Sequence, residues 1–247
     1  MTTRYLIGRA ELLTYPIEAP KKKVGDKAHP YTLTEAKRII VPEIETANRI
    51  FQELPAKACA DDLAVARLVL HPAYLAKSYF PKLLLDQVGL SSVGSRTRRI
   101  QPRRQTQKKA PPEMETTELF VSGTRAAMGN FPAFARSLNE QMPVAEQFAR
   151  IETFAAMTPA DRLHLEGTNV GHVFEVGLHL PPEGDASDVR ALFADYAKDC
   201  GFRVNGEFEF EAGRLLFVAV EGDATGLENL AQFTLTRVVR PMPHLRA

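Results

Sequence analysis

Serine, histidine and carboxylate side chains are the groups from which this chain could build a hydrolytic site. A serine nucleophile needs a hydroxyl on a strained turn, a histidine base and an orienting carboxylate, and known folds supply them with signatures such as Gly-x-Ser-x-Gly. That signature is absent, as are His-Gly-Thr and Gly-Thr-Ser. The nearest strings are Gly94-Ser95 and Ser122-Gly123-Thr124, which we interpret as turn or strand-end residues. The sequence therefore offers no candidate catalytic residue.

Histidine and cysteine spacing predicts no metal site. The six histidines include no pair four residues apart on a helix, and His172 and His179 lie seven residues apart on an expected strand, hence on opposite faces. The two cysteines, Cys59 and Cys200, are far apart, which argues against a zinc site and a disulfide framework and fits a reducing cytosol. No glycines form a phosphate-binding or dinucleotide-binding fingerprint. We expect neither metal nor cofactor.

One segment is strongly basic. Seven of the fourteen residues from 96 to 109 are arginine or lysine and none is acidic, so they could form a patch for phosphates or for an acidic partner. The alternative is a solvated loop, which the lack of stacking aromatics in the run favours. The candidate basic patch comprises Arg96, Arg98, Arg99, Arg103, Arg104, Lys108 and Lys109.

The elements that would position functional groups are clearest in residues 170–240. Residues 172–180 alternate, with apolar side chains on one face and Glu175 and His179 on the other, as in a half-buried strand. An amphipathic helix follows, with Asp185 or Ser187 as its N-cap and Gly201 after its end. Three further strands (202–210, 214–220, 233–239) and a short helix (225–231) complete a strand-helix-strand-strand-helix-strand order. This order predicts a ferredoxin-like module, a four-stranded antiparallel sheet with two helices on one face.

Residues 1–160 predict a second mixed α/β domain. Residues 5–7 begin as a strand, and Thr32 and Glu35 form a capping-box pattern at the start of a helix that Pro42 should kink or divide. We expect further helices at 73–88, 126–138 and 144–157, and strands at 63–70, 93–100 and 118–122. The basic loop extends over 96–115, and 158–171 is the preferred domain boundary. Tyr74, Tyr79 and Phe80 could form a docking surface, although aromatics at helical spacing more often belong to a core.

Overall composition sets few limits on function. The chain has 247 residues, 45% of them hydrophobic and 25% charged, with a formal net charge of +1. A near-neutral chain has no global attraction to nucleic acid or acidic membranes, so such partners would need a local patch. No apolar stretch reaches the length of about 18 residues needed to span a bilayer, and the N-terminus has no signal-peptide core. We expect a cytoplasmic protein.

Several segments, in order and spacing, resemble the N-terminal region of a family of large bacterial subtilisin-like serine peptidases. They begin with Tyr5-Leu6-Ile7-Gly8, His29-Pro30-Tyr31-Thr32, His71-Pro72-Ala73-Tyr74, Val93-Gly94-Ser95-Arg96, Thr117-Glu118-Leu119-Phe120 and Arg237-Val238-Val239-Arg240-Pro241-Met242-Pro243. In that family the catalytic domain begins shortly after the last segment, and the peptidase is commonly paired with an AAA-type ATPase in phage-defence modules. The family's catalytic motifs match nothing here, so the resemblance implies a non-catalytic chain.

The resemblance implies a prodomain or regulatory region that chaperones, inhibits or docks onto a subtilisin-like catalytic domain, in cis or in trans, and an AAA ATPase is a further expected partner. In such prodomains the sheet packs on the protease and the extended tail lies in its active-site cleft. The expected contacts are the solvent-facing sheet residues Glu175, His179, Thr234 and Thr236. The extended tail is expected at 241–247. The expected protease contacts in and just before it are Arg240, Pro241, Met242, Pro243, His244, Leu245, Arg246 and Ala247.

Two alternatives remain open. One is a nucleic-acid-binding adaptor that works through residues 96–109; the other is a ferredoxin-like scaffold that binds only other proteins. The ferredoxin-like half also invites comparison with an RNA-recognition module, but the strand at 214–220 has leucine where the first stacking aromatic would stand and lacks the glycine that usually precedes it.

Overall fold

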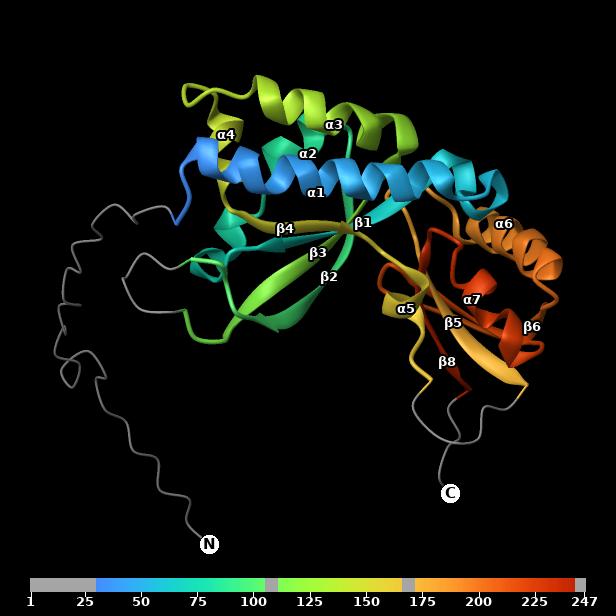
Figure 1. The fold of residues 1–247 in the computed structure, drawn as a ribbon. Coiled ribbons are helices and arrows are strands. Elements are labelled where there is room, and N and C mark those ends of the chain that lie inside the picture. The colour runs from blue at the N-terminus through green and yellow to red at the C-terminus, as the bar shows by residue number, and fades with distance from the viewer. Residues whose placement is uncertain (1–29, 105–110, 166–171, 243–247) are drawn as a thin grey trace, which may run out of the picture.

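The computed structural model describes residues 30–104, 111–165 and 172–242 and contains two four-stranded antiparallel sheets, each packed with helices (Figure 1). The expected strand at 5–7, the patch residues Lys108 and Lys109, and the tail from Pro243 onward lie outside the described residues. The mixed α and β composition predicted for both halves of the chain is confirmed.

The first sheet has the strand order β2-β3-β1-β4. Its strands are β1 (Leu63–Leu70), β2 (Ser91–Ile100), β3 (Met114–Thr124) and β4 (Ile151–Ala156). Four helices accompany it: α1 (Leu33–Glu53), α2 (Lys82–Val88), α3 (Arg125–Ser137) and α4 (Pro143–Ala149). The long helix α1 and helix α3 lie together over one face of the sheet. Alternate strand residues such as Leu68, Leu119 and Val121 point toward these helices and form the first core.

The second sheet has the strand order β6-β7-β5-β8. Its strands are β5 (Val173–His179), β6 (Arg203–Ala212), β7 (Leu215–Glu221) and β8 (Thr236–Pro241). Helices α6 (Ala186–Asp199) and α7 (Leu227–Leu230) pack on one face, where Phe174, Val176 and Phe193 belong to the second core. The short helix α5 (Pro159–Arg162) stands between the sheets in the chain. Single 3-10 turns occupy Ala56–Ala58, Ala60–Asp62, Pro72–Tyr74, Lys77–Tyr79 and Ala224–Gly226.

The two sheets share one topology. In each, the first strand in chain order lies between the third and the fourth, and the second strand forms an edge beside the third. A helix follows the first strand of each sheet and helical segments precede its fourth. We call residues 30–156 the first module and residues 172–242 the second module. From the sequence, this order of elements was expected in the second module alone.

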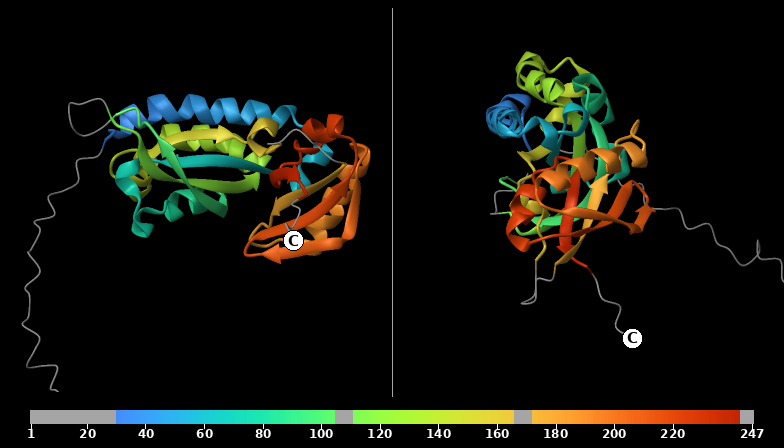
Figure 2. Two further views of the ribbon diagram at one scale, coloured as in Figure 1. Left: turned by 90° about the horizontal axis from the view of Figure 1, so that it is seen from below. Right: turned by 90° about the vertical axis from the view of Figure 1, so that its right-hand side faces the viewer.

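The modules are packed against each other through a common core. Val65, Val93 and Phe120, from the face of the first sheet turned away from its helices, cluster with Phe174 and Leu178 of the second sheet. Buried Arg162 of α5 donates to the carbonyl oxygens of Ala231 at 2.6 Å and Thr234 at 3.2 Å. The second module therefore sits at one end of the first sheet (Figure 2).

Most expected elements are present with shifted ends, and three differ. Residues 144–157 were expected as one helix, but α4 ends at Ala149 and 151–156 form strand β4, because pairing with β1 places Ile151 and Phe154 in the first core. Of the helix expected at 73–88 only the last turns, in α2, are α-helical. Pro42 does not divide α1, where it faces solvent. The capping box of Thr32 and Glu35 is confirmed.

Within the described ranges, no helix is both long and apolar enough to cross a membrane.

Candidate functional site

A row of side chains crosses all four strands of the second sheet on the face turned away from α6 and α7. The register pairs Phe210 with Phe217, Phe217 with Gly177, and Gly177 with Val238. The rings of Phe210 and Phe217 are stacked with centroids 4.8 Å apart. A Cβ atom at Gly177 would lie only 3.0 Å from both Phe217 Cε1 and Val238 Cγ1, so both side chains lie over the glycine. Gly177 lets the row pack closely on the sheet.

This row, which with Phe208 we call the phenylalanine face, is open to solvent at its β6 end, whereas Phe217 and Val238 are half-buried. Phe208 is 57% exposed and Phe210 is 55% exposed, the highest values among the large hydrophobic side chains of the described residues. Beside them is a groove of about 230 Å³, whose apolar lining includes Phe208, Phe210, Phe217 and Met242 and whose polar lining consists of three glutamates (Glu175, Glu207, Glu209). Contiguous exposed apolar surface of this kind is typical of an interaction site, whereas isolated exposed side chains are ordinary.

The four residues predicted to face solvent on this sheet are all buried, so that prediction of exposure is wrong. Glu175 is covered by Arg240, whose Nε donates to its Oε2 at 2.5 Å. His179 is buried under the first module. Thr234 precedes β8 and donates to the Leu63 carbonyl oxygen at 2.7 Å, and Thr236 is fully buried. Strand alternation located the faces correctly for Glu175 and His179 but could not show what covers them.

His179 lies at the centre of the junction between the modules. Its ring is 5.3 Å from that of Phe120, and its Nδ1 is 3.3 Å from the Val93 carbonyl oxygen. Burial, with the positive charge of Arg237 as the next cause, lowers the pKa of His179 to about 3. The imidazole is therefore neutral at physiological pH, and its Nδ1–H can donate to Val93.

The start of the expected tail is part of the sheet. Arg240 and Pro241 belong to β8 and pair with Glu175 and Phe174, and the Met242 backbone N–H donates to the Val173 carbonyl oxygen at 3.1 Å. Only the residues after Met242 remain as candidates for a free tail. Strand β8 is an edge of the sheet, so the backbone N–H that Pro241 lacks is not needed to pair with a further strand.

Four of the five arginines of the basic patch pair with carboxylates of the same chain. Glu118 is fully buried and accepts from Arg96 and, at 2.5 Å, from Arg98. Arg104 pairs with Glu35 at 2.5 Å, and Arg103 pairs with Glu43 at 2.5 Å. Arg99 is exposed on β2. The pattern of basic residues was visible in the sequence, but the acidic partners of these four paired arginines lie in other elements, so their guanidinium groups are not free cations.

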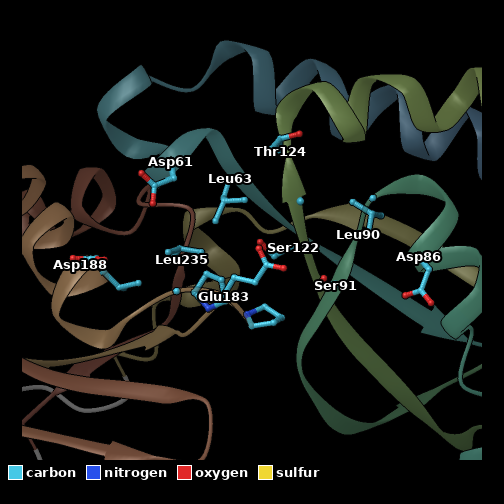
Figure 3. Close-up of a pocket in the computed structure, with 16 residues that line it drawn as sticks. Asp61, Leu63, Asp86, Leu90, Ser91, Ser122, Thr124, Glu183, Asp188 and Leu235 are labelled. Carbon is cyan, nitrogen blue, oxygen red and sulfur yellow. The ribbon is translucent and has the colours of Figure 1, made fainter.

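A second concave region lies between the modules on the side of α2 and the connection from β5 to α6 (Figure 3). This acidic cleft has a volume of about 620 Å³, and carboxylates from both modules line it: Asp61, Asp86, Glu183 and Asp188. Ser122 and Thr124, from the string noted in the sequence, also lie on its wall. None of the lining residues is a histidine, so the cleft does not present the Ser-His-carboxylate arrangement. Groups of three or more metal-ligating side chains are absent from the described residues.

The aromatic cluster near His71 has a structural role. Tyr74 is buried and its ring contacts Tyr79 and His71 edge-on, with the Arg150 guanidinium 5.4 Å from the Tyr74 ring centre. Burial raises the pKa of Tyr74 to about 12. Phe80 is 37% exposed at the margin of this cluster.

The chain matches no family model, no curated protein and no solved structure.

Proposed function

We propose that this chain is a non-catalytic prodomain or regulatory region that docks through its second module onto a subtilisin-like catalytic domain. The observation that carries the proposal is the exposed phenylalanine face, on the sheet surface left free by α6 and α7. The proposal rests on the family resemblance for the identity of the partner and on this face for the mode of contact.

The strand order supports a ferredoxin-like arrangement, the type of module expected for such a prodomain. The order β6-β7-β5-β8 places the first strand of the module between the third and the fourth, with α6 and α7 as the connecting helices. The same order in the first sheet supports a tandem of two such modules, with α1 added to the first.

The contact would combine two kinds of recognition. Burying an exposed phenylalanine contributes about 1.5–3 kcal/mol by removal of apolar surface from water, and Phe208 and Phe210 are each more than half exposed. The segment after Met242 would then lie as an added strand in the protease cleft, where main-chain hydrogen bonds supply affinity and side-chain pockets supply register. Because β8 ends at Pro241 on an edge of the same sheet, the tail leaves from beside the docking face.

The test is inhibition of a subtilisin-like catalytic domain of the resembling family by this chain added in trans. The F208D/F210D double variant should weaken inhibition at least ~100-fold, because two apolar anchors become charged. Leu192→Asp is the matched control: Leu192 is 37% exposed on α6, which covers the other face of the sheet, so inhibition should be unchanged. Deletion of residues 243–247 should abolish inhibition while leaving measurable binding.

Each alternative predicts a different pattern. A protein-binding scaffold would bind its partner through the phenylalanine face without inhibiting proteolysis, and removal of the tail would then have no effect. Binding that survives F208D/F210D unchanged would refute the proposed docking mode. The nucleic-acid adaptor requires salt-dependent binding through Arg99, Lys108 or Lys109, since the other four patch residues, all arginines, are held by carboxylates of this chain.

A further inference from the structure

A second pocket at the junction combines three arginine side chains with an apolar wall. It has a volume of about 450 Å³ and is bounded by Arg96 of β2, by Arg237 and Arg240 of β8, and by His164, which follows α5. Phe217 and Val238 form part of an apolar wall. Elements of both modules therefore contribute to this arginine pocket, and residues separated by more than a hundred positions in sequence meet there.

The positive charges around the pocket exceed the nearby negative charges. Two buried carboxylates lie among four guanidinium groups: Glu118 accepts from Arg96 and Arg98, and Glu175 accepts from Arg240. Arg237 has no carboxylate within 4 Å in the described part of the chain. The bonds of Arg96 and Arg240 use Nε, which leaves their terminal amino groups outside these two contacts. Such groups form the fork that binds oxoanions.

The guanidinium of Arg237 is held in place by an aromatic ring. Its Cζ lies 3.8 Å from the centroid of Phe120, and Arg96 Cζ lies 5.6 Å from the same centroid. Phe120 is fully buried, so the ring is a fixed support for both cations. Burial, with the neighbouring charge of Arg96 as the next cause, lowers the pKa of Arg237 to about 10, while the charge of Glu118 acts in the opposite direction.

We propose that the arginine pocket binds the phosphate group of a small phosphomonoester. A phosphate dianion between Arg96 and Arg237 would compensate the excess charge, and planar guanidinium groups match its oxygens in bidentate geometry. The volume exceeds what a bare phosphate fills and falls in the range of small-molecule sites. The wall with Phe217 and Val238 suits an apolar or aromatic remainder of the ligand. The proposal does not depend on the docking function.

The test is isothermal titration calorimetry on the full chain with inorganic phosphate, AMP and succinate, at low and at physiological salt. Phosphate and AMP should bind at one site, with AMP tighter than phosphate because it also contacts the apolar wall. Arg237→Gln should weaken both about 10-fold or more, and Arg237→Lys should recover only part of the loss because the fork is missing. Arg99→Gln should leave binding unchanged, since Arg99 is exposed on β2 outside the pocket.

Three results would overturn the proposal. Absence of binding heat with both phosphate and AMP would show that the arginines of the pocket are already compensated by groups of the protein. Equal weakening by Arg99→Gln and Arg237→Gln would show diffuse attraction instead of a site. Succinate binding as tightly as phosphate would assign the pocket to carboxylates. Arg237→Lys keeps the charge on Phe120 and provides the second variant if the glutamine variant fails to fold, as judged by circular dichroism.

Discussion

The guanidinium of Arg237 in the second module lies over the ring of Phe120 in the first, 3.8 Å from its centre. The other neighbours of that ring include His179, also from the second module. Phe120 thus joins a core to which both sheets contribute, and its contacts require the two modules to keep one relative placement. The ring therefore supports two of the arginines that bound the arginine pocket.

Phe120→Ala should therefore destabilise the whole chain. Loss of a fully buried phenylalanine leaves a cavity and costs about 3–5 kcal/mol. Chemical denaturation followed by both far-UV circular dichroism and tyrosine fluorescence measures the loss. Phe210→Ala serves as the control because Phe210 is 55% exposed, and it should cost less than about 1 kcal/mol. Equal losses in the two variants would contradict the role of Phe120 as a junction core residue.

The second module could be outlined from its sequence because each of its signals is local. Alternation at 172–180, an N-cap at Asp185 and Gly201 after the helix locate β5 and α6 within a residue or two. The first module was harder, since Ile151 and Phe154 are three residues apart, a spacing that suits a helix. In the strand they reach the same core because the pairing of β4 with β1 shifts register between Val69 and Leu70. Only pairing with β1 decides between helix and strand, and that pairing is not local.

The solvent exposure of the second sheet could not be predicted either, because it also depends on contacts that are distant in sequence. Alternation placed Glu175 and His179 on the face away from the helices, but burial there comes from Arg240 and from the first module. The phenylalanine face had a signal that was missed: Phe208 and Phe210 stand in a strand whose intervening residues are glutamates. An exposed edge strand with two same-facing aromatics indicates a docking surface more directly than threonines do.

The stability of the chain should fall in acid because His179 is buried in its neutral form. Its pKa is about 3 in the folded chain against an ordinary value of 6.5, so the unfolded state binds the extra proton between these values. Its contribution is complete above pH ~6.5 and is lost as the pH falls toward 3, by at most about 1.4 kcal/mol per pH unit. Denaturation of His179→Phe between pH 7 and 4 should show a shallower pH dependence.

The control for this pH effect is His172→Gln, because His172 is exposed just before β5. That variant should keep the pH dependence of the parent chain. A parent-like slope in His179→Phe would mean that other groups cause the acid sensitivity.

Arg103 should act as a structural residue instead of a polyanion contact. Its backbone N–H donates to Glu152 Oε1 at 2.8 Å, and its Nη1 donates to the Glu152 carbonyl oxygen at 2.6 Å. Arg103→Ala should lower the free energy of unfolding by about 1–3 kcal/mol, because the Glu152 carbonyl oxygen and the Glu43 carboxylate lose a charged donor, whereas the backbone bond is kept. Arg99→Ala should change it by less than about 0.5 kcal/mol. If Arg103→Ala leaves the stability unchanged but abolishes nucleic-acid binding, the result would instead favour the nucleic-acid-binding adaptor.

Two glycines should respond to alanine in opposite directions. At Gly123, in β3 on the wall of the acidic cleft, a Cβ atom would lie 2.4 Å from Leu90 Cδ2 and 2.8 Å from the Gly89 carbonyl oxygen. The backbone contact cannot be relieved by a side-chain rotation, so Gly123→Ala should destabilise the chain by about 1–3 kcal/mol. Gly129 lies in helix α3, where an added Cβ atom would meet nothing within 4 Å. Because glycine costs about 0.5–1 kcal/mol relative to alanine inside a helix, Gly129→Ala should stabilise the chain by about that amount.

Thermal unfolding of both variants measures these changes in stability. If Gly123→Ala is as stable as the parent chain, the turn from α2 into β2 can move away from β3.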